Sequence, residues 1–126
     1  MTQHNVTIKD VDYIINAFKG KQGFLLKAKL LKVISPALAA LRGTAEDADM
    51  VAIITAVVSE VVSRIDESET LDLIIELLSN VYKGSVKLDF DKEFTQNYSA
   101  IYLLLAEVVK YNYKDVFQTL GITIAE

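Results

Sequence analysis

The sequence predicts an all-α fold, a compact bundle of five or six helices with at most one very short two-stranded β pairing. Apolar residues recur at helical spacing along nearly the whole chain. A chain of 126 residues with 52% hydrophobic and 24% charged residues fits one domain with an ordinary core. One Pro and five Gly are too few for a turn-rich β-sandwich. We therefore expect a single helical domain over residues 1–126, with mobile ends at 1–7 and 121–126.

The first helix is expected directly after Asp10, where apolar residues follow the i, i+3, i+4, i+7 rule. Those residues are Val11, Ile14, Ile15 and Phe18. The sequence GKQG, residues 20–23, should end this helix, and a second helix follows over residues 24–43. Pro36 has no N–H group, so the second helix must kink or restart near Ser35.

Residues 44–65, TAEDADMVAIITAVVSEVVSRI, are rich in Val and Ile, which prefer strands. Their apolar run is nevertheless more than twice the length of a typical strand. At about 100° per residue, its apolar side chains fall within about half of the helix circumference. Glu60 and Arg64 interrupt it well before the roughly 20 residues that a membrane span needs. We predict a buried helix here.

A fourth helix is expected from about Ser68 to Lys83, with Gly84 as its stop. The side chains predicted to face the core are Leu71, Ile74, Ile75, Leu78, Val81 and Tyr82. The alternating SVKL at 85–88 is the one candidate strand, and its candidate partner is NVTI at 5–8.

A fifth, long helix should run from Asp91 to about Tyr111. Its predicted buried stripe consists of Phe94, Tyr98, Ile101, Leu105 and Val108. Residues 114–120 then form a last turn or short helix that stops at Gly121.

The charges divide unevenly along the chain, whose net charge is −4. Residues 1–42 carry seven Lys/Arg against two Asp, and residues 43–126 carry six Lys/Arg against fifteen Asp/Glu. Phosphate binding needs basic residues on one surface of a basic domain, so this balance argues against nucleic acid. We interpret Lys27, Lys29 and Lys32 as a solvated helix edge. A dipolar molecule can still steer a charged partner or stack on copies of itself.

Catalytic and metal-binding residues are scarce. His4 is the only histidine and Cys is absent, so nucleophile–histidine pairs and zinc sites lack their central residues. DFDKEF at 89–94 begins like a calcium loop, but it has Phe94 where Gly is needed and Ala100 where Glu is needed. Its aspartates are better interpreted as helix caps. We expect no enzyme activity, no cofactor and no metal.

The long helix also carries apolar residues outside its buried stripe. Leu103 points about 180° away from Phe94, so the two side chains cannot face the same core. We hypothesise that these outlying residues form a partner-binding surface. Its members are Tyr102, Leu103, Val109 and Tyr113.

The run LDFDKEFTQNYSAIYLLLAEVVKYNYKDVF, residues 88–117, resembles the C-terminal half of the tail assembly chaperones of long-tailed bacteriophages and prophages. The front half is also similar, with VTIK, then ISPALAAL, then two helices headed by acids, so the resemblance covers about residues 6–120. It departs in the linker KGSVKL and at TQNY, residues 95–98, where Gly-Arg commonly precedes the Tyr. The residues that match the family's pattern are Phe90, Asp91, Phe94, Tyr98, Asn112, Tyr113 and Phe117.

The resemblance implies a non-enzymatic role. Such chaperones bind the long, helical, aggregation-prone tape measure protein in the infected cell and help tail tube subunits polymerise around it. They leave before the virion is complete. For this chain the resemblance implies work in the host cell cytoplasm with the tape measure protein as partner, the tail tube protein and further copies of the chain being additional candidates. No membrane is implied. Two alternatives stay open: a structural tail or neck protein retained in the particle, and a small helical adaptor that binds a host protein.

Overall fold

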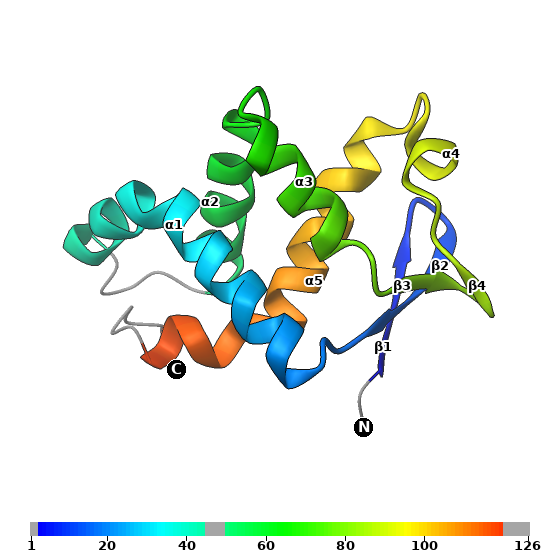
Figure 1. Ribbon diagram of the computed structural model, residues 1–126, viewed down its shortest axis with the longest axis horizontal. Coiled ribbons are helices and arrows are strands. Elements are labelled where there is room, and N and C mark those ends of the chain that lie inside the picture. The colour runs from blue at the N-terminus through cyan, green and yellow to red at the C-terminus, as the bar shows by residue number, and fades with distance from the viewer. Residues whose placement is uncertain (1–2, 45–49, 120–126) are drawn as a thin grey trace.

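The computed structural model of the chain describes residues 3–44 and 50–119. Over these residues it has five helices and one four-stranded antiparallel sheet, so the fold is mixed α/β. The prediction of an all-α bundle, and of a domain that is entirely helical, is wrong. Figure 1 shows the sheet at one side of the molecule and the long helices beside it.

Strands β1 (Gln3–Ile8) and β2 (Val11–Asn16) form an antiparallel hairpin. The turn between them consists of Lys9 and Asp10, with φ angles of 51° and 67°. Positive φ at both central residues marks a type I′ turn, whose twist matches that of the flanking strands. The hairpin is therefore closed by two residues that adopt this conformation without a glycine.

The helix predicted at residues 11–18 is wrong, because most of this segment is β2. Tyr13 and Ile15 are buried while Asp12 is exposed, which is the two-residue alternation of a strand. Residues 3–7, predicted to be mobile, form most of β1.

Strands β3 (Val81–Lys83) and β4 (Val86–Lys87) complete the sheet in the order β1-β2-β3-β4. Gly84 begins the two-residue turn between them with a φ of 63°. Glycine suits the first central position of a type II′ hairpin turn because it has no Cβ to clash.

The predicted fourth helix is too long, because α3 spans only Ser68–Leu77. The chain then turns into the sheet, where the Asn16 amide donates to the Asn80 carbonyl at 3.0 Å. The predicted pairing of residues 85–88 with 5–8 is also wrong, since β4 pairs with β3 and β1 pairs with β2.

Helix α1 (Gly20–Thr44) begins inside the GKQG sequence and continues through Pro36 without a break in helical assignment. The Ser35 hydroxyl donates a hydrogen bond to the Lys32 carbonyl at 3.4 Å. In a regular helix the backbone N–H of residue 36 would donate to this carbonyl, but proline has no N–H. Helix α2 (Met50–Ser63) confirms the helix predicted within residues 44–65. In Figure 1, α1 and α3 lie toward the viewer, and α2 lies behind them.

The long helix predicted from Asp91 is divided into α4 (Phe90–Phe94) and α5 (Tyr98–Thr119). The separating residues include Gln96, whose φ is 58°. Asp89 caps α4, as predicted, by accepting a hydrogen bond from the Lys92 amide at 3.3 Å. The separate last helix predicted from residue 114 is the continuation of α5, and the predicted stop at 121 lies outside the described residues.

The core lies between the helices and the inner face of the sheet. Several predicted core residues are buried, but Tyr98, Leu71 and Ile75 are exposed, so their predicted inward orientation is wrong. Leu71 and Ile75 point outward because the buried face of α3 carries Leu73, Ile74 and Leu77 instead. The largest fully buried side chains are Tyr13, Phe94, Ile15, Leu26, Leu30, Ile34, Ile74, Leu77, Leu78 and Leu104.

Candidate partner-binding surface

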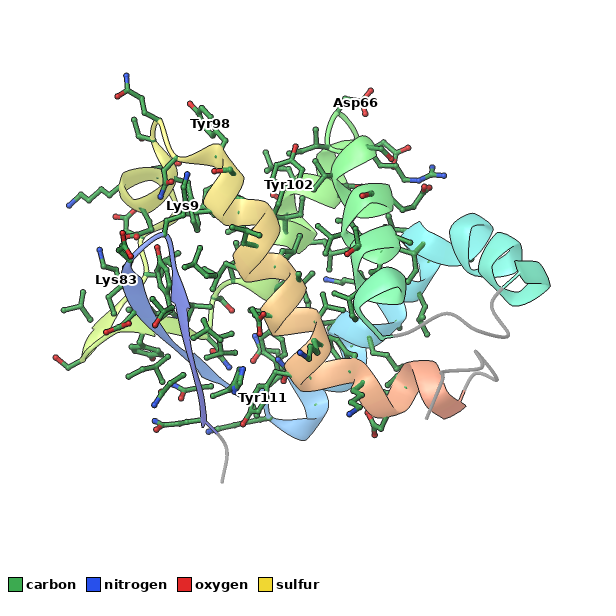
Figure 2. All side chains as sticks on the ribbon, turned by 180° about the vertical axis from the view of Figure 1, so that it is seen from behind. Lys9, Asp66, Lys83, Tyr98, Tyr102 and Tyr111 are labelled. Carbon is green, nitrogen blue, oxygen red and sulfur yellow. The ribbon has the colours of Figure 1, made fainter. Side chains whose placement is uncertain are left out.

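The aromatic residues near the end of α5 hold the N-terminal segment of the chain. The ring of Tyr111 stacks on His4 of β1, with centroids 5.2 Å apart and planes 15° from parallel. The ring of Tyr113 stacks on Phe18 at 6.4 Å, and its hydroxyl donates to the Gly23 carbonyl at 3.0 Å. Figure 2 labels Tyr111 beside the sheet, toward the C-terminal half of α5. These rings therefore close the core at the helix end.

Asn112 joins the same contacts through both ends of its side-chain amide. Its Oδ1 accepts a hydrogen bond from the Phe18 amide at 3.1 Å, and its Nδ2 donates to the Val108 carbonyl at 3.0 Å. The connection between β2 and α1 is thereby fixed against α5. A Cβ on Gly23 would lie 3.2 Å from the Phe18 Cβ, so glycine permits this close approach.

Val109 and Tyr113, two of the four residues proposed for partner binding, are buried. Burial raises the pKa of the Tyr113 hydroxyl above the ordinary value of 10.0, and the negative charge of Glu76 raises it further. Both residues belong to the core, and Tyr113 packs against the β2–α1 connection. Neither offers a surface to a partner in this conformation.

Three more residues that match the family pattern, Phe90, Asp91 and Phe94, belong to α4. Phe90 and Phe94 meet edge to face with centroids 5.0 Å apart, and Phe94 is fully buried. Asp91 is exposed in the first turn of α4, and its carbonyl accepts a hydrogen bond from the Thr95 hydroxyl at 2.5 Å. Phe117 lies in α5, but its side chain is outside the described part of the structure. These contacts shape the junction between the sheet and α5.

Three large apolar side chains at the start of α5 are exposed: Tyr98 at 65%, Tyr102 at 47% and Leu103 at 50%. Figure 2 shows Tyr98 and Tyr102 on the N-terminal half of the helix. Ala106 lies between the directions of Tyr102 and Leu103 on the helix, so a small side chain separates the larger ones. We call Tyr98, Tyr102 and Leu103 the α5 apolar surface.

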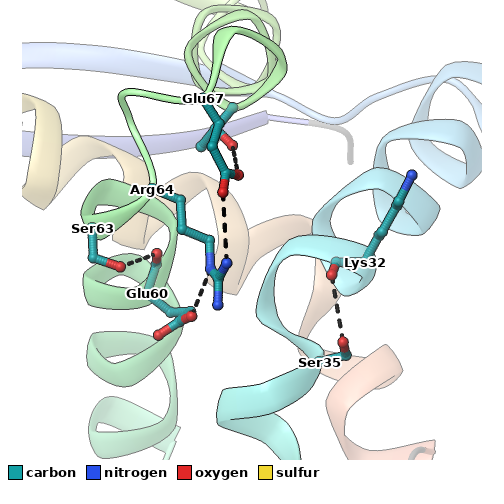
Figure 3. Close-up of polar contacts among 7 residues, drawn as sticks. Lys32, Ser35, Glu60, Ser63, Arg64 and Glu67 are labelled. Atoms are coloured by element: carbon teal, nitrogen blue, oxygen red, sulfur yellow. Dashed lines mark hydrogen bonds and ion pairs between the residues drawn. The ribbon is translucent and has the colours of Figure 1, made fainter.

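A second feature is a groove of about 830 Å³ between α1, α3 and the connection from α2 to α3. Val33 and Leu73 contribute apolar side chains to its lining, and the remainder is largely charged. Figure 3 shows Lys32 and Ser35 on α1 at one side of this space and Arg64 and Glu67 at the other, with the Lys32 ammonium extending away from Arg64. We call it the α1–α3 groove.

Ion pairs cross one part of this groove and border another. Lys29 Nζ on α1 lies 3.8 Å from Glu76 Oε1 on α3. Arg64 pairs with Glu60 at 2.7 Å and with Glu67 at 3.8 Å. The sequence analysis interpreted the α1 lysines as a solvated helix edge and did not predict the groove. The excess of basic residues in the first part of the chain and of acidic residues in the second was the signal that could have indicated it.

Among the described residues, no group of three or more His, Cys, Asp and Glu side chains is placed to hold a metal ion. In the described part of the chain, no helix is both long enough and apolar enough to cross a membrane.

The family model described as "Phage tail assembly chaperone protein, TAC" matches residues 9–123, which is most of the chain. No curated protein matches the sequence. No solved structure matches the fold either.

Proposed function

This chain belongs to the phage tail assembly chaperone family, and on that premise we propose that it binds a helical segment of the tape measure protein. It acts in the host cell cytoplasm, where it keeps this long partner soluble while tail tube subunits polymerise around it. It is absent from the mature virion. The role is one of protein binding and needs no catalytic group.

The observation that carries the proposal is the α5 apolar surface. Three large apolar side chains within six residues of one helix are exposed to water. Isolated exposed apolar residues are ordinary on soluble proteins, whereas neighbouring ones mark sites of interaction. Tyr98 and Tyr102 are four residues apart, so they stack along one line of the helix. Leu103 stands beside that line.

The shape of this surface suits an amphipathic helix. A helix that docks on a protein presents apolar side chains at positions i, i+3, i+4 and i+7. Such a stripe would lie over the Ala106 position, between the larger side chains of Tyr102 and Leu103. Tyrosine contributes apolar ring area while its hydroxyl stays in water at the rim, which favours an interface that must form and later dissociate.

The test is binding to a helical fragment of the tape measure protein encoded by the same phage. Leu103→Asp should cost about 0.5 kcal/mol or less of stability, because the side chain is half exposed. At the centre of an interface the same change should cost over about 2 kcal/mol of binding, a roughly 30-fold increase in Kd. Thermal melting and isothermal titration separate the two effects.

Val86→Asp is the matched control. Val86 is 67% exposed, but it lies on β4, in the sheet rather than on α5. The control variant should bind the fragment as the wild type does. Equal binding by Leu103→Asp and wild type would remove the α5 apolar surface from the proposal, and failure of the wild type to bind any tape measure fragment would refute the function itself.

A further inference from the structure

Two charged helix faces of opposite sign lie side by side on one surface of the molecule. The exposed face of α1 carries Lys21, Lys29 and Lys32, and residues 19–32 contain no acidic residue. The exposed face of α3 carries Glu69, Asp72 and Glu76. Figure 1 shows the two helices next to each other in the layer nearest the viewer.

Only some of the charged side chains on these two helix faces form ion pairs within the molecule. The Lys29–Glu76 pair joins the two helices at one point, with an N–O distance of 3.8 Å. Lys32, Glu69 and Asp72 also line the α1–α3 groove, but none of them forms an ion pair with any other described residue. A cation on one wall and two carboxylates on the other are left for an external partner.

Exposed apolar side chains lie on the same two helices as these charges. Leu25 on α1 and Leu71 and Ile75 on α3 are exposed. On the helical wheel Leu25 lies on the same flank of α1 as Lys29, which is the flank that meets α3. Burying such side chains is what gives a charged interface its affinity, since exposed ion pairs alone contribute little.

We propose that this face binds a second copy of the chain around a two-fold axis. A surface that has a basic helix beside an acidic helix is complementary to itself, because a two-fold rotation sets each basic helix on the acidic helix of the other copy. The complementary charge is thus present in the same sequence. Leu25, Leu71 and Ile75 of the two copies become buried between the charged rows.

This interface goes beyond the proposed function and does not depend on it. Helices α1 and α3 form the front layer in Figure 1, whereas Tyr98 and Tyr102 project from α5 in the layer behind. The dimer would therefore leave the α5 apolar surface of each copy open, and it would offer two such surfaces to one long partner.

Sedimentation equilibrium of the purified chain tests the oligomeric state. The wild type should form a dimer whose Kd rises with salt between about 50 and 500 mM NaCl, because exposed charges are screened over a shorter distance at higher salt. Lys32→Glu and Asp72→Lys should each weaken the dimer by at least about tenfold, since each places like charges opposite each other in both halves of the interface.

Mixing the two variants gives the sharpest measurement. In the mixed dimer, Glu at 32 in one copy meets Lys at 72 in the other, and the second half of the interface keeps the native residues. The mixture should therefore recover the wild-type dimer, although each variant alone does not. Lys87→Glu is the control with the same change in net charge as Lys32→Glu, and it lies on β4 away from this face. It should dimerise normally.

Three results would overturn the proposal. The first is a wild type that remains monomeric at all concentrations measured. The second is a dimer that neither charge reversal weakens, which would place the interface elsewhere. The third is a mixture that stays as weak as its components. Circular dichroism melting of each variant separates loss of the dimer from loss of the fold.

Discussion

The Tyr13 hydroxyl donates a 2.6 Å hydrogen bond to Glu93 Oε2, which ties β2 to the short helix α4. The other carboxylate oxygen of Glu93 lies 3.1 Å from Lys83 Nζ, at the end of β3. One carboxylate on α4 therefore contacts two neighbouring strands, β2 across 80 residues of sequence and β3 across 10. Tyr13 is fully buried, so its hydroxyl has no water to replace this acceptor.

Tyr13→Phe should lower the free energy of unfolding by about 1.5–3 kcal/mol, because it removes a hydrogen bond to a charged group and leaves part of a carboxylate unsatisfied. Chemical denaturation measures the loss directly. Tyr98→Phe is the matched control, since Tyr98 is exposed, and it should change stability by about 0.5 kcal/mol or less. Equal stability of the two variants would mean that the Tyr13–Glu93 hydrogen bond makes no net contribution to the free energy of unfolding.

Gln96→Gly should stabilise the protein by about 0.5–1 kcal/mol. Gln96 has a φ of 58°, a conformation that a Cβ disfavours and glycine adopts freely. In the family pattern Gly-Arg commonly precedes the tyrosine, which puts the glycine at this position. Gln96→Ala keeps the Cβ and should give no such gain. A stability that rises equally for both variants would show that the glutamine side chain, and not the backbone, is the unfavourable element.

Asn112→Ala should destabilise the protein by about 1–3 kcal/mol, because the Phe18 amide loses its acceptor in a partly buried site. Asn112→Asp keeps an oxygen for that amide, so it should cost less. Hydrogen exchange at Phe18 is the specific readout: exchange should become faster in the Ala variant than in the Asp variant. Unchanged exchange in both would show that the β2–α1 connection is fixed by the ring stacking of Tyr113 alone.

Helix α2 could be predicted because its formation follows from local sequence. The segment that forms α2 is longer than a strand, and its apolar residues gather on one side, as the buried Ile54, Val57 and Val61 show. The β1–β2 hairpin escaped prediction for two reasons. Its type I′ turn uses Lys9 and Asp10 instead of a glycine pair, and the apolar spacing after Asp10 fits a helix and a strand equally well.

Of the residues proposed for the partner surface, Leu103 is half exposed, as predicted. The prediction measured its direction from Phe94 along one continuous helix, whereas the structure puts Phe94 in α4 and Leu103 in α5, so the geometric reason given for it does not hold. The burial of Tyr113 depends instead on the β2–α1 connection folding back over the second half of α5. That contact joins Tyr113 to Gly23, 90 positions away, and no local pattern encodes it.

The stability of the fold should also depend on alkaline pH through Tyr13 and Tyr113. Burial raises the pKa of both hydroxyls above the ordinary value of 10.0, and a hydrogen bond to Glu93 raises that of Tyr13 further. A group whose pKa is higher in the folded state binds its proton more tightly there. Its contribution to stability is complete below about pH 10 and is lost as the pH rises toward the folded-state pKa.

Chemical denaturation of the wild type and the Tyr13→Phe and Tyr113→Phe variants between about pH 8 and 11 tests this dependence. All other titratable groups are common to the wild type and the variants, so the difference between wild type and variant isolates each tyrosine. The advantage of the wild type should be constant up to about pH 9 and should shrink above pH 10. If the stability difference between wild type and variant stayed constant to pH 11, the buried hydroxyls would ionise as readily in the folded chain as in the unfolded one. Burial would then not disfavour the phenolate form.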